Sequence, residues 1–131
     1  MNDASRGEAA PLTTGADDPR ARALAHLQGI AERALATNRG RVAELDEALG
    51  LAVHGGLTDL RRQLAVDTAH QLVGSAGTFG YHHVSDVARR VERFFKEGVA
   101  GDEASIRVAT DELRQIRQEL DRGPDDDLDS D

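Results

Sequence analysis

Apolar residues recur every three or four positions along most of the chain, and this spacing constrains the fold more than any other feature. The clearest run is Val84, Val87, Ala88, Val91, Phe94 and Phe95. Four further runs keep the same spacing: Leu24 to Leu35, Val42 to Val53, Leu57 to Ala76, and Ile106 to Leu120. Side chains spaced in this way share one face of an α-helix, whereas a strand alternates at every second residue. The pattern therefore predicts an all-α protein.

Composition and connection length narrow this prediction to one architecture. The chain has 131 residues with three Phe, one Tyr and no Trp, which favours helices over sheets and fits a single domain. Short connections between helices make neighbours antiparallel. We expect an antiparallel four-helix bundle over residues 19–121, with an N-terminal helical extension. Whether Asn38-Arg39-Gly40 separates the first run from the second stays open.

The two ends of the chain differ from the middle in composition and charge. Residues 1–18 and 122–131 have no apolar period and are rich in small, polar or acidic residues, which predicts disorder. Of the formal net charge of −8, −7 lies in these ends, so the middle of the chain is close to neutral. Without a basic patch we expect no nucleic-acid partner.

Missing residue types and segments exclude several classes of protein. The chain has no Cys, so it can form neither a disulfide framework nor a zinc thiolate site. It has no N-terminal signal pattern and no apolar run of the roughly 20 residues that a membrane span needs. We expect a cytoplasmic protein without a membrane span.

The stretch from Ala69 to Gly80, AHQLVGSAGTFG, carries the candidate chemistry. On a helical wheel His70 falls outside the apolar stripe, in a sector shared with Asp67 and Gly74, and it should reach solvent. Gly74 lies one turn after His70, where glycine costs a helix about 1 kcal/mol relative to alanine. A missing side chain beside an exposed imidazole leaves room for the active site of another protein.

This stretch resembles the histidine phosphotransfer (HPt) domains of two-component phosphorelays. Their hallmark is H-x-L-K-G-S, followed by a glycine ten positions after the histidine. The matching positions here are His70, Leu72, Gly74, Ser75 and Gly80. The family's hydrophobic residue and Glu or Gln, about 21 and 22 positions after the histidine, are matched by Val91 and Glu92. The resemblance spans about residues 38–121.

The resemblance implies that His70 accepts a phosphoryl group from the aspartate of a receiver domain and passes it on. The partners would be a response-regulator receiver domain, a hybrid histidine kinase, or both. The receiver would bring Mg²⁺, so the chain needs no metal or cofactor of its own. With no ATP-binding motif, the chain would be a phosphocarrier and not a kinase. We expect a monomer.

Glu92 is expected beside His70 because a helical hairpin centred near Tyr81 brings positions 70 and 92 face to face. A carboxylate there would accept an N–H from one ring nitrogen and leave the other as the nucleophile. Val66 and Val73, which bracket His70 along its helix, are expected to surround the ring with apolar groups. Such surroundings favour the neutral imidazole.

One position departs from the family pattern. The basic residue usually found three positions after the histidine, which is thought to hold phosphoryl oxygens, is Val73 here. Arg89 and Lys96 lie one turn to either side of Glu92, and our hypothesis is that they supply the missing charge. Gly74, Ser75, Arg89 and Lys96 are the candidate contacts to the phosphoryl group or the receiver.

Two other functions remain open at this point. The bundle could dock receivers without carrying phosphate, or it could be a structural bundle that dimerises through an exposed apolar stripe. His82 and His83 are adjacent and so point about 100° apart on a helix, with no third ligand nearby, which argues against a metal site.

Overall fold

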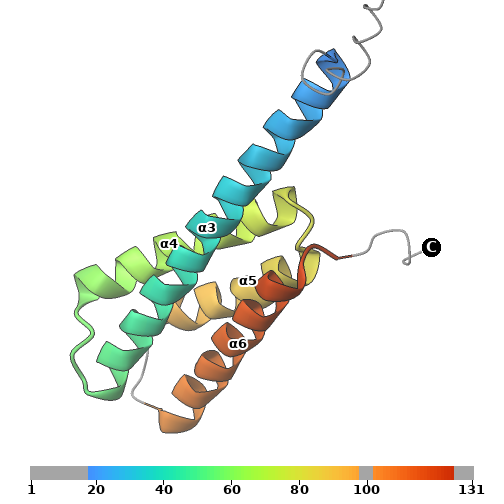
Figure 1. The fold of residues 1–131 in the computed structure, drawn as a ribbon. Coiled ribbons are helices and arrows are strands. Elements are labelled where there is room, and N and C mark those ends of the chain that lie inside the picture. Colours follow the sequence, from blue (N-terminus) through green and yellow to red (C-terminus); the bar gives the residue numbers. More distant parts are fainter. Residues whose placement is uncertain (1–17, 98–101, 126–131) are drawn as a thin grey trace, which may run out of the picture. The chain divides into compact units, whose positions relative to one another are not determined.

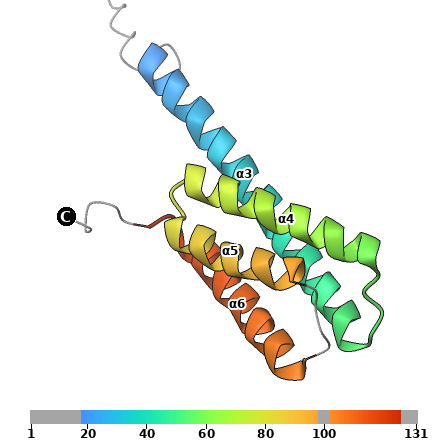
Figure 2. The same cartoon turned by 180° about the vertical axis from the view of Figure 1, so that it is seen from behind.

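The computed structural model describes residues 18–97 and 102–125, and within these ranges the chain forms helices but no strands. Four helices follow one another: α3 (Pro19–Val53), α4 (Asp59–Thr78), α5 (His82–Lys96) and α6 (Glu103–Arg122). From Ala34 onward, successive helices run in opposite directions (Figure 1 and Figure 2). The predicted all-α, antiparallel four-helix bundle is confirmed. None of the described helices is long and apolar enough to cross a membrane.

The chain divides between Arg33 and Ala34 into two units. Helix α3 is nevertheless continuous through residues 38–40, so no break separates the first apolar run from the second. In the first unit the described residues are helical, and Leu24 and Leu27 expose 58% and 60% of their surface. The N-terminal helical extension is therefore present, and its apolar residues lie outside the core.

A single core lies within the second unit, and all four helices contribute to it. Its fully buried members, at 0% exposure, are Val42, Leu45, Ala69, Leu72, Ala76, Val84, Val87, Ala88, Val91, Phe95, Leu113 and Ile116. Phe79 and Phe94 are partly buried against it. The apolar run from Leu57 to Ala76 is not buried along its whole length, because Leu60 and Leu64 are 71% and 54% exposed. Only its Ala65, Val66, Ala69, Leu72 and Ala76 edge is covered.

Polar caps define where α4 and α6 begin. The Thr58 hydroxyl accepts the backbone N–H of Arg61 at 3.1 Å, and Asp102 accepts that of Ala104 at 3.1 Å. These bonds satisfy amide groups that the first turn of a helix leaves without partners. Hydrogen bonds from Ser105 and from the Ala104 amide hold the pKa of the Asp102 carboxyl below its usual value.

The turn between α4 and α5 is fixed by Gly80, whose φ of +89° is a conformation that favours glycine. The end of the chain packs on this turn. Pro124 Cβ would lie 3.4 Å from a Cβ at Gly80, and the Asp125 amide donates to the Gly80 carbonyl at 2.9 Å. Helix α6 includes Arg122, and residues 123–125 follow it. The rest of the segment predicted to be disordered, 126–131, lies like 1–17 outside the described residues.

Candidate functional site

His70 lies in the second half of α4, and its side chain is 74% exposed. Its Nδ1 lies 3.1 Å from Oε2 of Glu92 on α5, whose own side chain is only 13% exposed. The hairpin register predicts this contact, and the structure confirms it. Glu92 is thus largely buried, while the His70 side chain reaches solvent.

The hydrogen bond constrains the protonation of the imidazole. A carboxylate can only accept, so the bond requires a proton on Nδ1 of His70. In the neutral ring, Nε2 then keeps its lone pair and is the nitrogen that can attack an electrophile. The exposed His70 ring is accessible to a reacting group on a second protein.

Lys96 and Arg89, the two candidate cations, have different partners. Lys96 Nζ lies 3.6 Å from Oε2 of Glu92, the oxygen that also contacts His70. Arg89 Nη1 instead lies 2.9 Å from Oδ1 of Asp86 on its own helix. The structure therefore brings Lys96 into the His70–Glu92 cluster and pairs Arg89 with a different carboxylate.

Gly74 leaves open space beside the histidine. A Cβ at this position would meet no heavy atom within 4 Å, and the backbone there is helical. Neither packing nor conformation requires glycine, which destabilises a helix interior by about 1 kcal/mol relative to alanine. The described part of the chain therefore gives no packing reason for glycine at this position.

Ser75 lies away from the histidine. It is half-buried, and its Oγ accepts a hydrogen bond from Asn38 Nδ2 of α3 at 3.1 Å. Asn38 is 1% exposed, and its Oδ1 accepts from Arg41 at 2.7 Å. The sequence motif placed Ser75 among the phosphoryl contacts, but five residues turn a helix by about 140° from His70. Ser75 joins α4 to α3 instead.

The expected apolar surround of His70 does not exist. Val66 is 5% exposed and belongs to the core, and Val73 is half-buried against it. Both side chains turn toward the interior because they lie on the covered edge of α4, whereas His70 reaches solvent. These two valines therefore do not shield the imidazole.

Two polar residues that join α4 to α5, Ser85 and Arg62, were not identified from the sequence. Ser85 is 5% exposed, and its Oγ donates to the Val73 carbonyl at 2.8 Å. Arg62 Nη1 donates to the Phe95 carbonyl at 3.0 Å. The position of Ser85 was predictable, since it lies three and seven positions before Ala88 and Glu92 and therefore on the same face of α5. The contact of Arg62 was not predictable, because its acceptor is a backbone atom of another helix.

The comparison with protein families decides what this bundle is. One family model, described as the Hpt domain, matches residues 29–123. The match covers more than half of the chain. This chain belongs to the Hpt domain family. No curated protein and no solved structure matches the chain significantly.

The Hpt match contains the whole His70–Glu92–Lys96 cluster and the turn at Gly80. It begins at Gly29, so the helical residues from Pro19 to Gln28 precede it. Within residues 18–97 and 102–125 of this Hpt protein, no three His, Asp or Glu side chains gather into a group that could hold a metal ion.

Proposed function

We propose that this Hpt protein is a phosphohistidine carrier, in which Nε2 of His70 accepts a phosphoryl group from a receiver aspartate and passes it to another. The observation that carries the proposal is the exposed His70 whose Nδ1 is 3.1 Å from Glu92. The open surface over Gly74 supports it, because a receiver must bring its aspartyl phosphate up to the ring. The cytoplasmic location and monomeric state predicted from the sequence belong to the proposal.

In the proposed step, the Nε2 lone pair attacks phosphorus, and the bond between phosphorus and the aspartyl oxygen breaks. The aspartate leaves as a carboxylate, and the ring gains positive charge while its proton stays on Nδ1. Glu92 faces that proton and stabilises the developing charge. The reverse sequence returns the phosphoryl group to a second receiver. Mg²⁺ would come with the receiver.

Lys96 is the best placed cation to offset the charge of the phosphoryl oxygens. Its ammonium group shares Glu92 with the imidazole, and its side chain is 63% exposed. Val73 cannot serve, because its apolar side chain packs against the core. In this proposal, Lys96 takes over much of the role of the basic residue that the family usually has after the histidine.

Exposed leucines on α4 support docking of a protein partner. Leu60 and Leu64 precede His70 by about 15 and 9 Å along the helix axis, at 1.5 Å per residue, and both are more than half exposed. Exposed apolar side chains can take part in an interaction surface, and these two lie about 80° and 120° around the helix from His70. The same leucines, together with Val73, also fit the second candidate, a domain that docks receivers but carries no phosphate.

The test incubates the full chain with a phosphorylated receiver and Mg²⁺, and follows the label on the chain. Acid-labile label on the wild type that is lost in His70→Gln supports the carrier. His83→Gln is the matched control, because His83 contacts Glu119 through the same nitrogen at 2.6 Å. Label that persists in His70→Gln excludes the proposed site. Binding of the receiver without any label favours the docking domain.

A further inference from the structure

We infer that Arg62 is a positioning residue, which holds the end of α5 so that Glu92 and Lys96 stay beside His70. Its effect on transfer rests on the proposed function. Its effect on the geometry of His70 can be measured without any phosphoryl group.

Arg62 reaches from α4 to the last turn of α5. Its Nη1 donates to the Phe95 carbonyl at 3.0 Å, and its side chain is only 27% exposed. The backbone amide of Glu97, which caps α5, also donates to this carbonyl. Arg62 adds a charged donor at the C-terminal end of the helix, where the helix dipole attracts a cation. No other described side chain has a hydrogen bond to this carbonyl.

Arg62 is itself held in place. Its Nε lies 3.6 Å from Oδ1 of Asp59, one turn earlier on α4. Phe95, whose carbonyl it binds, has a fully buried side chain. The contact therefore joins two fixed points, one on each helix of the hairpin.

The His70–Glu92 pair needs such support. With His70 74% exposed, the pair resembles a surface ion pair, and such pairs contribute little to holding a geometry. Two buried or half-buried hydrogen bonds bracket it: Ser85 to the Val73 carbonyl on one side and Arg62 to the Phe95 carbonyl on the other. Ser85 is near the turn at Gly80, which already fixes that end. Arg62 acts at the opposite end of the α4–α5 pair.

Losing Arg62 would act through its neighbours in α5. Phe95 follows Glu92 by three residues and precedes Lys96 directly, so a frayed last turn moves both groups relative to His70. The imidazole would then lose its fixed acceptor, although the core of the bundle stays intact.

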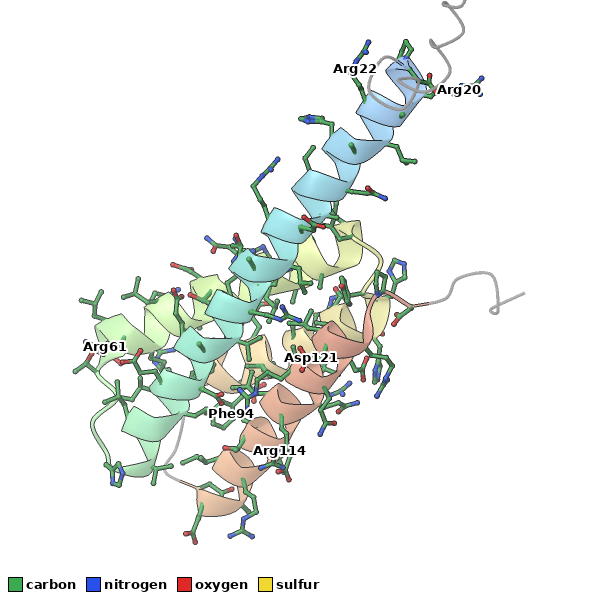
Figure 3. The ribbon with its side chains drawn as sticks, in the orientation of Figure 1. Arg20, Arg22, Arg61, Phe94, Arg114 and Asp121 are labelled. Atoms are coloured by element: carbon green, nitrogen blue, oxygen red, sulfur yellow. The ribbon has the colours of Figure 1, made fainter. Side chains whose placement is uncertain are left out.

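The experiment compares Arg62→Ala with Arg62→Lys and with Arg61→Ala. Arg61 is the exposed neighbour of Arg62 near the start of α4 (Figure 3), so its variant controls for loss of a cation. On the unphosphorylated full chain, the ¹⁵N NMR signals of the His70 ring report the Nδ1 hydrogen bond. Arg62→Ala should shift them toward the values of Glu92→Gln, Arg62→Lys should shift them less, and Arg61→Ala should leave them unchanged.

In the transfer assay, Arg62→Ala should be slower by about 10-fold, a size typical of residues that orient a reacting side chain. Unchanged ring signals in a folded Arg62→Ala overturn the inference, and so does an equal shift in Arg61→Ala. If Arg62→Ala does not fold, Arg62→Gln is judged by the same signals. A wild-type chain that accepts no label defeats the proposed function, and the ring signals still decide the role of Arg62.

Discussion

Two histidine–glutamate pairs join helices of this bundle through the same atoms, Nδ1 and Oε2. His70 and Glu92 join α4 to α5 at 3.1 Å, and His83 and Glu119 join α5 to α6 at 2.6 Å. The glutamates are almost equally buried, at 13% and 12% exposure of their side chains. Chemically, the two sites are near copies.

Their surroundings differ. Beside His70, Gly74 leaves the surface open and Lys96 supplies a cation. The groups that contact His83 or its glutamate are polar or acidic. Glu119 also accepts a hydrogen bond from Gln115 at 3.2 Å, and Asp125 accepts the His83 backbone N–H at 3.0 Å. The His83 side chain is 49% exposed, against 74% for His70.

A hydrogen bond from histidine to glutamate therefore does not by itself make a reactive site. An acidic neighbour such as Asp125 repels a phosphoryl group, and the end of the chain packs near His83. The proposed transfer therefore belongs to His70, and we propose that His83 only stabilises the contact of α5 with α6. Substitutions at and around the two histidines test this difference, and their expected effects decrease from Gly74 to Asp125.

Filling the space beside His70 should have the largest effect. Gly74→Gln should slow transfer by about 100-fold, because a displacement of about 1 Å in the approach of reacting groups costs that much. Stability should not fall, since a Cβ at Gly74 meets nothing and glycine disfavours the helix. Rates with a phosphorylated receiver and thermal melts measure both. Gly50→Gln, at an equally open glycine of α3, is the control, and equal slowing by it would refute the role of Gly74.

Removing the charge of each glutamate separates the two pairs. Glu92→Gln should slow transfer by about 10-fold, because the imidazole loses the anion that orients it and faces its developing charge. Glu119→Gln should leave the rate within about twofold, since Glu119 contacts His83 and not His70. Single-turnover transfer rates check this. A larger loss in Glu119→Gln than in Glu92→Gln would reverse the assignment.

The two cations near Glu92 should differ by a smaller amount. Lys96→Ala should slow transfer about threefold to fivefold, in line with the roughly 1 kcal/mol that an exposed charge contributes at most. Arg89→Ala should change the rate less, because Asp86 already pairs with it. The same assay at two salt concentrations tests the charge effect, since salt should reduce the loss in Lys96→Ala. If Arg89→Ala is the slower variant, Lys96 is not the replacement for the missing basic residue.

The smallest effect should appear only in stability. Helix α5 has no side-chain cap from Tyr81, and Asp125 accepts an amide of its first turn from 42 positions away. Asp125→Ala should therefore cost about 1 kcal/mol, or about 4–8 °C in Tm for a domain of this size, with unchanged transfer. Thermal melts followed by circular dichroism measure it. Asp111→Ala, which removes a surface pair with Arg114, should leave Tm within about 2 °C.

Apolar spacing predicted the helices well because local periodicity depends on the chain alone. It predicted the burial of α4 poorly. Leu60 and Leu64 have helical spacing with the buried Ala69 and Leu72, yet they are exposed. Spacing shows which residues share a helix, but whether an edge of that helix is covered depends on the neighbouring helices.

The candidate site was predictable where it depends on one hairpin. The turn at Gly80 determines that positions 70 and 92 face each other. The contact of His70 with Glu92 could therefore be predicted from their distances along the chain to this turn. Ser75 and Asp125 were not predictable in this way. Their partners, Asn38 and the backbone of His83, are 37 and 42 positions distant, and no local pattern links them.

The sequence by itself determined that the chain is a helical bundle and that His70 meets Glu92 on the open side of a hairpin. It did so because helix period and turn length are local properties. Only the tertiary structure decided that Ser75 serves the α3–α4 contact, that Lys96 joins the cluster while Arg89 does not, and that the second histidine is tied to the end of the chain. These outcomes depend on how packed helices bring distant residues within hydrogen-bonding range.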